Sequence, residues 1–273
     1  PAEGAFDEAY LDRVEAVVAM CARAGVHVIV DFHQDAYSKE IGEDGAPLWA
    51  IHPAPEMLLE GPLGDSLPAR IASAQVQRAY TSFSADAAAD PGAVRLRAGS
   101  ARGARHGAAG FADEPLVLGY DLYNEPITND RYLVGFHDRV SAAIREVDPR
   151  HLLLFEPSAT RNFTERAPAG RAPFADDGGV YAVHLYTFAF SDSRAELERL
   201  TRADLEPNVD NAVNEAGRWD VPLLVGEWGI GPDAPNADRY VRIMHELFDE
   251  HFASAAVWLW KEESQGRGGF FEQ

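Results

Sequence analysis

Two glutamates each end a short apolar run, where catalytic carboxylates are common. Glu125 follows the run Leu116–Tyr123, and Glu227 lies near the end of the run Pro222–Trp228. Each carboxylate is therefore expected at the C-terminal tip of a buried parallel strand, the rim that carries the chemistry of β/α barrels. Two carboxylates on such a rim can cleave a glycosidic bond, because one protonates the leaving oxygen and the other attacks the sugar carbon. The pair indicates a glycoside hydrolase.

Polar neighbours on the same strand ends fit a sugar-binding site. Asn124 directly precedes Glu125, and its amide can hydrogen-bond the substrate hydroxyl next to the reacting carbon. His184 and Tyr186 alternate along one strand and so point the same way. Tyr186 can hold the nucleophilic carboxylate through its hydroxyl, while His184 can bond the catalytic pair or a sugar hydroxyl. A core histidine, an interface tyrosine and rim glutamates that are merely solvated are the structural alternatives.

Aromatic residues of the last apolar run supply a second kind of sugar contact. Trp258 and Trp260 alternate and share one side of this run. An indole ring at a barrel mouth offers a flat apolar platform to a sugar ring. We predict this role for Trp260, which lies nearer the strand tip.

The first apolar run ends in the polar residues His33 and Asp35, which we also assign to the sugar site. A His-x-Asp pair can instead hold zinc, which makes a metal-dependent hydrolase an alternative. That alternative needs more ligands at other strand tips. His184 can serve, but His151 lies at the start of its strand, which is the wrong end. We predict no metal and no cofactor.

Strand and helix signals alternate along the chain, which is typical of a parallel sheet with helical crossovers. Six apolar runs are predicted strands, and amphipathic stripes between them predict helices. The runs are Val26–Phe32, Leu116–Tyr123, His151–Phe155, Val180–Tyr186, Pro222–Trp228 and Ala255–Trp260. A (β/α)8 TIM barrel needs eight strands, so we predict one incomplete barrel domain over 1–273, truncated at its N-terminus. An open doubly wound sheet is the alternative.

One segment departs from this alternation. Residues 85–110 are rich in Arg, Gly and Ala and show almost no apolar periodicity, although a crossover helix is due there. The pattern predicts an atypical segment in place of that helix. A local frameshift in a GC-rich gene and a genuine flexible loop are the two interpretations.

The net charge and the lengths of the apolar runs argue against several classes of binding partner. A formal charge of −20 argues against nucleic acid and anionic membranes as partners, because proteins that bind these polyanions carry an excess of Lys and Arg. No apolar run approaches the roughly 20 residues of a membrane span. The single cysteine, Cys21, excludes an internal disulfide. The compartment and the oligomeric state are not encoded in the pattern, and we expect any secretion signal to lie upstream of Pro1.

The motifs around these residues resemble the endoglycoceramidase-like branch of glycoside hydrolase family 5, in clan A. The resemblance rests on Asp31–Ser38 (Asp-Phe-His-Gln-Asp-Ala-Tyr-Ser) with Gly45–Ala50 (Gly-Ala-Pro-Leu-Trp-Ala), on Asn124–Pro126 and on Gly226–Gly229. It covers nearly the whole chain except residues 85–110.

This resemblance implies a (β/α)8 barrel, retention of anomeric configuration and no metal. It makes Glu125 the acid/base and Glu227 the nucleophile. The sugar subsite nearest the bond would be lined by His33, Asp35, Asn124, His184, Tyr186 and Trp260. The family's arginine on an early strand and its C-terminal β-sandwich have no counterpart in these residues, a departure that bears on catalytic competence.

The resemblance further implies a carbohydrate or glycolipid substrate, and the leading prediction is the glycan–ceramide linkage of glycosphingolipids. Other β-glucosides, cleaved in the manner of a β-glucosidase or cellulase, are an alternative. A non-catalytic sugar-binding remnant is another. An apolar slot for a ceramide could be lined by Leu48, Trp49, Ile51, Met57, Leu58 and Leu59, although ordinary loop packing explains the same residues.

Overall fold

The computed structural model describes residues 2–59, 67–84, 91–128, 130–164, 176–189, 193–231 and 233–259. The chain divides into two compact units. The first comprises Pro1–Ser158 with Arg171–Gly179, and the second comprises Ala159–Gly170 with Val180–Gln273. That the whole chain acts as one domain stays a prediction.

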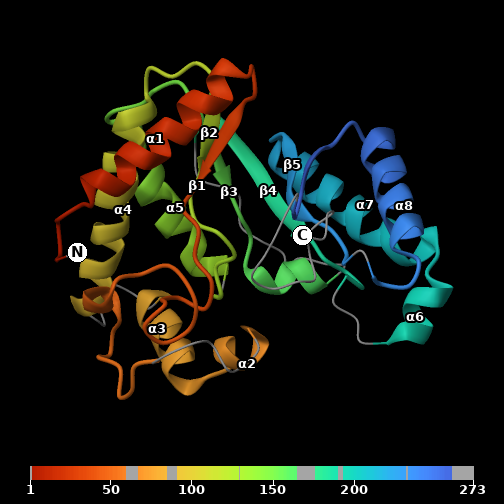
Figure 1. Cartoon of the computed structure of the whole chain (residues 1–273), viewed down its shortest axis with the longest axis horizontal. Coiled ribbons are helices and arrows are strands. Elements are labelled where there is room, and N and C mark those ends of the chain that lie inside the picture. The colour runs from red at the N-terminus through yellow and green to blue at the C-terminus, as the bar shows by residue number, and fades with distance from the viewer. Residues whose placement is uncertain are drawn as a thin grey trace. The chain divides into compact units, whose positions relative to one another are not determined.

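The first unit is built on three parallel strands. These are β1 (Val28–Asp31), β2 (Val117–Asp121) and β3 (Leu152–Phe155), which pair in that order. The helices of this unit are α1 (Glu8–Arg23), η1 (Leu48–Ala50), α2 (Leu67–Ile71), α3 (Ala74–Ser84), α4 (Pro91–Phe111) and α5 (Asp130–Arg145). Helix α1 precedes β1, whereas α4 comes between β1 and β2 in the chain and α5 between β2 and β3 (Figure 1). Because β1 and β2 are parallel neighbours, their carboxyl ends lie at the same edge of the sheet.

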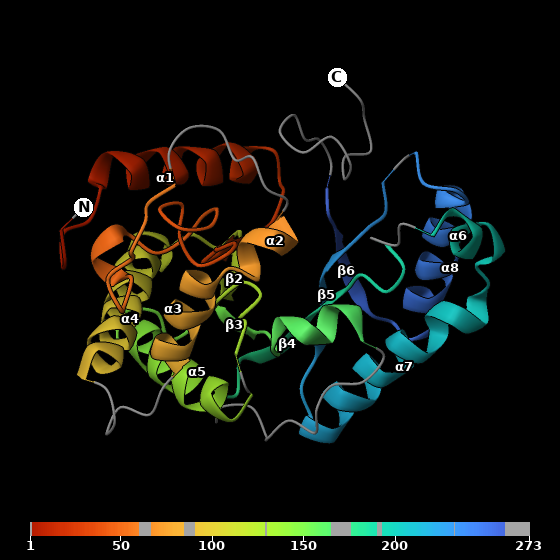
Figure 2. The same ribbon diagram turned by 90° about the horizontal axis from the view of Figure 1, so that it is seen from below.

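The second unit repeats the pattern. Its strands are β4 (Gly179–Leu185, of which Val180 onward belongs to this unit), β5 (Leu223–Trp228) and β6 (Ser254–Val257), which are parallel and pair in that order. Its helices are η2 (Ala159–Phe163), α6 (Arg194–Arg199), α7 (Arg202–Trp219) and α8 (Ala237–Glu250). Helices α7 and α8 lie side by side next to the strands (Figure 2).

All six observed strands overlap the six predicted apolar runs. Strand β4 is buried along its whole length, which is why its sequence reads as a continuous apolar run. Close strand packing also selects a glycine on β2. A Cβ at Gly119 would lie 2.4 Å from the carbonyl oxygen of Leu152, so no larger residue fits against β3.

Helix α4 corrects the prediction for residues 85–110. The structure has a helix over Pro91–Phe111, where the sequence pattern predicted a segment without one; residues 85–90 lie outside the described part. The buried stripe of α4 consists of Ala101, Ala104, Ala108 and Phe111. These spacings of three and four residues are helical, but alanine is too small to register as an apolar stripe. Alanine and arginine also favour helix, so the frameshift interpretation loses its motivating observation.

None of the helices in the described part of the chain has the length and hydropathy of a membrane-spanning helix.

Candidate active site

In the first unit, Asn124 and Glu125 lie in the segment that leaves β2, after Leu122 and Tyr123. Asn124 is buried, and its side-chain amide donates to the backbone carbonyl of Gln34 at 3.1 Å. Glu125 is half-buried and adopts a left-handed backbone with φ of 43°. Such a conformation costs a non-glycine residue about 1–2 kcal/mol. A strained backbone conformation persists only where surrounding contacts hold it in place, and such residues cluster at functional sites.

His33 bridges two carboxylates just beyond β1. Its Nδ1 lies 2.7 Å from Oδ2 of Asp31, and its Nε2 lies 3.2 Å from Oδ2 of Asp35. Burial alone would lower the pKa of His33, but the hydrogen bonds and charges of the two aspartates outweigh it and raise the pKa to about 11. His33 is therefore an imidazolium at neutral pH. With both ring nitrogens bound to carboxylates, it is a poor metal ligand, which weakens the zinc alternative.

The loop after His33 holds Asp35 in place. Asp35 and Asp44 exchange backbone hydrogen bonds of 3.2 and 2.9 Å across the loop. The Tyr37 hydroxyl donates to the carbonyl of Ala50 at 2.9 Å. Gly45 has φ of 121°, and a Cβ there would lie 2.7 Å from the Tyr37 carbonyl oxygen. The Gly-Ala-Pro-x-Trp stretch thus closes the loop that presents His33 and Asp35.

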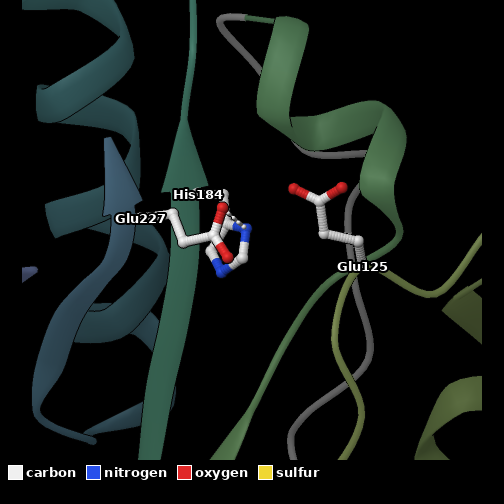
Figure 3. A group of neighbouring side chains, drawn as sticks. All are labelled: Glu125, His184 and Glu227. Carbon is white, nitrogen blue, oxygen red and sulfur yellow. Dashed lines mark ion pairs between the residues drawn. The ribbon is translucent and has the colours of Figure 1, made fainter. Parts of the chain in front are cut away.

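In the second unit, Glu227 lies at the end of β5 and is held from β4. The Tyr186 hydroxyl donates to Oε2 of Glu227 at 2.8 Å. Nδ1 of His184 lies 3.5 Å from the same oxygen, an ion pair when the ring is protonated (Figure 3). The predicted link between Tyr186 and the glutamate is thus present in the structure. Figure 3 also labels Glu125, on the segment that follows β2.

A register shift places Glu227 opposite His184. Val183 pairs with Val225, whereas the next residue, His184, pairs with Glu227, so Gly226 is the extra residue of a bulge. Bulges re-aim side chains and often lie next to active sites. A Cβ on Gly226 would lie 3.0 Å from Nε2 of His184. Glycine at this position therefore leaves room for the imidazole beside the carboxylate.

A buried ion pair holds the 3-10 helix η2, which binds the backbone of Tyr186. Arg161, on η2, is fully buried and pairs with Glu215 of α7 at 3.1 Å. The next residue, Asn162, accepts the backbone N–H of Tyr186 at 2.9 Å. The ion pair fixes η2, and η2 fixes the backbone that carries the tyrosine.

Sequence reasoning missed several of these residues. Asp31, Gln34 and Arg161 were not assigned to the site. Neither was Glu156, whose side chain accepts the backbone N–H of Glu125 at 2.9 Å. Glu156 carried a usable signal, because it ends the apolar run of β3 as Glu125 and Glu227 end theirs. Trp260 lies outside the described residues, so its predicted role as a sugar platform stays a prediction.

A family model described as Cellulase (glycosyl hydrolase family 5) matches residues 1–264. The chain belongs to glycosyl hydrolase family 5. The predicted fold class, a (β/α)8 barrel of which six strands lie in the described part of the chain, is confirmed, and the open doubly wound sheet is set aside.

Within this family the chain is similar to endoglycoceramidases. It is 31% identical to endoglycoceramidase I of Rhodococcus hoagii (strain 103S), with 94% of this chain and 54% of that protein covered. It is 28% identical to the endoglycoceramidase of Cyanea nozakii, over 96% of this chain and 55% of that protein. A solved structure of endo-glycoceramidase II from Rhodococcus sp., in a cellobiose-like imidazole complex, matches with a TM-score of 0.81 at 27% identity. That match covers 99% of this chain and 65% of the other. The chain spans just over half the length of these two curated relatives.

Proposed function

We propose that this family 5 chain carries the catalytic residues of a retaining endo-β-glycosidase, with Glu227 as nucleophile and Glu125 as acid/base. The observation that carries the proposal is the setting of Glu227, whose Oε2 faces both the Tyr186 hydroxyl at 2.8 Å and His184 at 3.5 Å. Hydrogen-bond donors aimed at one carboxylate oxygen orient the other oxygen for attack and favour the ionised form. A nucleophilic carboxylate needs both a fixed orientation and a negative charge.

The proposed reaction has two steps. Glu227 attacks the anomeric carbon while the glycosidic C–O bond breaks and Glu125 gives its proton to the leaving oxygen. The glycosyl-enzyme ester then reacts with water, whose proton goes to Glu125, and Glu227 leaves as a carboxylate. Glu125 thus acts first as acid and then as base. Two inversions at the anomeric carbon give net retention.

The glycan–ceramide linkage is the substrate bond we propose. Relatives that match most of this chain are named endoglycoceramidases, and a solved structure of one holds a lactosyl-enzyme intermediate. In this chain, Leu48, Met57 and Leu58 expose apolar side chains on the loop around η1. Exposed apolar side chains such as these can contact the acyl chains of a glycolipid. Ile51, predicted for the same slot, is buried instead and belongs to the core.

Trapping of the glycosyl-enzyme tests the mechanism directly. The chain is incubated with a 2,4-dinitrophenyl 2-deoxy-2-fluoro-β-lactoside, digested and examined by mass spectrometry. We expect the label on the peptide containing Glu227, and no label in Glu227→Gln. Exposed Glu246→Gln on α8 is the matched control and should label as wild type. Label on another residue would refute the assignment of the nucleophile.

A glycolipid panel tests the substrate class. Release of intact lactose from lactosylceramide, monitored by mass spectrometry, supports the ceramide linkage. Hydrolysis of cellobiosides without release from lactosylceramide favours a cellulase-like activity, for which the 32% identity to endoglucanase 3 of Fibrobacter succinogenes over 117 residues is the motivating observation. Binding of lactose without labelling or turnover favours the non-catalytic sugar-binding alternative.

A further inference from the structure

Gln34 joins the loop after β1 to the loop that carries the acid/base. Its side-chain nitrogen donates to the carbonyl oxygens of Asn124, at 2.8 Å, and Glu125, at 3.1 Å. Its side-chain oxygen accepts the Tyr37 N–H at 3.0 Å and the Tyr80 hydroxyl at 2.6 Å. Gln34 is buried. All four bonds lie within the first unit and use both ends of one amide.

The orientation of this amide is fixed by its partners. Two carbonyl oxygens, of Asn124 and Glu125, can only accept, and the Tyr37 N–H can only donate. Burial raises the pKa of Tyr80 well above its ordinary value, so its hydroxyl keeps its proton. Glutamate has the shape of glutamine, but its ionised form has no donor and its protonated form has only one, so it cannot donate to both carbonyl oxygens. The site therefore selects glutamine.

Glu156 holds the other side of the same peptide. It is buried at the end of β3, and its Oε2 accepts the backbone N–H of Glu125 at 2.9 Å. The Glu125 residue thus has its N–H bound by Glu156 and its carbonyl bound by Gln34. This is the residue with the left-handed φ of 43°. Bonds on both of its backbone groups are the kind of contact that holds a strained conformation in place.

An aromatic cluster shields this clamp from water. The Tyr37 ring meets Tyr80 edge-on at 5.2 Å, and Phe83 stacks on Tyr123 at 5.5 Å. Hydrogen bonds that water cannot reach are stronger than exposed ones, and they are costly to break. A change of one atom at Gln34 should therefore move the Asn124–Glu125 peptide rather than be absorbed by solvent.

We propose that Gln34 and Glu156 are positioning residues that clamp the backbone of Glu125 in its left-handed conformation and so aim its carboxyl group for proton transfer. The inference rests on the proposed function for the kinetic role of Glu125. Its structural part, the clamp on the peptide, stands on its own. Two experiments separate these parts.

The kinetic experiment uses Gln34→Glu, with Gln77→Glu at an exposed position of α3 as the matched control. On lactosylceramide, a poor leaving group that needs the acid, we expect kcat/KM to fall by roughly 10- to 100-fold, within the range of general-acid contributions. On 2,4-dinitrophenyl β-lactoside, which needs no acid, we expect a change below about threefold. Gln77→Glu should match wild type on both. Equal losses on the two substrates would overturn the positioning role.

The second experiment reads the clamp without activity. Labelling with ¹³C-carbonyl Asn and ¹⁵N-Glu marks only the Asn124–Glu125 and Asn214–Glu215 peptides, because the chain has no other Asn-Glu pair. Glu156→Leu should speed hydrogen exchange at the Glu125 amide by roughly tenfold or more, by loss of its acceptor. The Glu215 amide, inside α7, should keep its rate. Faster exchange at both amides would mean general unfolding.

The conservative variant completes this test. In Glu156→Gln the amide oxygen can still accept the Glu125 N–H, so exchange at Glu125 should return toward the wild-type rate. Unchanged exchange at Glu125 in Glu156→Leu would overturn the clamp, whatever the activity of the chain. A chain that fails to label at Glu227 but shows this exchange pattern would refute the proposed function and leave the clamp standing.

Discussion

The Tyr186 hydroxyl and the Glu227 carboxylate are joined by a 2.8 Å hydrogen bond between neighbouring strands β4 and β5. The tyrosine is buried, and its backbone N–H donates to the Asn162 carbonyl. A hydroxyl donor whose own backbone is held by a hydrogen bond can favour one orientation of a carboxylate. This bond therefore links the packing of η2 to the direction in which Glu227 points.

Tyr186→Phe should test the value of that bond. The variant removes the donor but keeps the ring. A hydrogen bond to a charged group contributes about 1.5–3 kcal/mol, so we expect kcat/KM to fall by roughly 10- to 150-fold. Loss of a donor to the ionised form should also raise the pKa of Glu227, which moves the acidic limb of the kcat/KM profile to higher pH. A profile that falls in height without moving would contradict a direct role on the carboxylate.

Glu125→Ala should separate the two steps of the reaction. Without the acid, lactosylceramide turnover should drop by a factor of roughly 10² or more, while the first step on 2,4-dinitrophenyl β-lactoside should be nearly spared. Azide should then restore turnover and yield a β-lactosyl azide, because it needs no base to attack the glycosyl-enzyme. The readouts are pre-steady-state release of dinitrophenol and NMR of the azide product. Equal damage to both substrates, with no azide product, would move the acid/base role elsewhere.

Gly226→Ala should disturb His184 through contact alone. The new Cβ would lie 3.0 Å from Nε2 and 3.1 Å from Cδ2 of the imidazole, closer than ordinary packing allows. Overpacking of this kind costs about 1–3 kcal/mol. We expect a lower melting temperature and slower labelling of Glu227 by the fluorinated lactoside. The matched control is Gly217→Ala on α7, where a Cβ meets nothing within 4 Å and should do no harm.

Strand β4 was predictable because its whole length is buried, which gives one continuous apolar run. Glu125 and Glu227 were found because the first follows the apolar run of β2 and the second lies near the end of β5. Helix α4 was not predictable by the same rule. Its buried face uses Ala101, Ala104 and Ala108, which remove little apolar surface and so leave little periodic signal.

The supporting residues were hidden for a different reason. The Gln34 side chain reaches a peptide 90 residues away, and Glu156 reaches one 31 residues away. No local pattern encodes such pairs, since they arise only when parallel strands bring their tips together. The bulge at Gly226 is similar, because the need for glycine lies on the neighbouring strand.

Asp148→Asn should destabilise the first unit. Asp148 is fully buried, accepts the Tyr120 hydroxyl at 2.6 Å and also bonds His151. Burial would raise the pKa of Asp148, but these bonds outweigh it and lower the pKa to about 2. The lowered pKa means that the carboxylate stabilises the fold above its ordinary pKa of about 4 and stops doing so as the pH falls through about 2. We expect a loss of about 1–3 kcal/mol at pH 7 by urea unfolding. A loss that stays the same at pH 7 and pH 2 would argue against the carboxylate.

His33→Gln should show the opposite pH dependence. The pKa of His33 is raised from 6.5 to about 11, so the charged ring stabilises the fold fully below pH 6.5. That contribution should decline as the pH rises toward 11, because the unfolded chain is already neutral there. The free energy of unfolding of wild type should therefore exceed that of His33→Gln most at pH 6, and the gap should narrow by pH 10.

The same substitution at exposed His27 is the control for the loss of an imidazole. NMR gives the direct check, since the ring signals of His33 should remain those of an imidazolium from pH 6 to pH 9. A ring that titrates near pH 6.5 would mean that Asp31 and Asp35 do not hold its proton. The bridge between β1 and the loop at Asp35 would then be a neutral hydrogen bond rather than an ion pair.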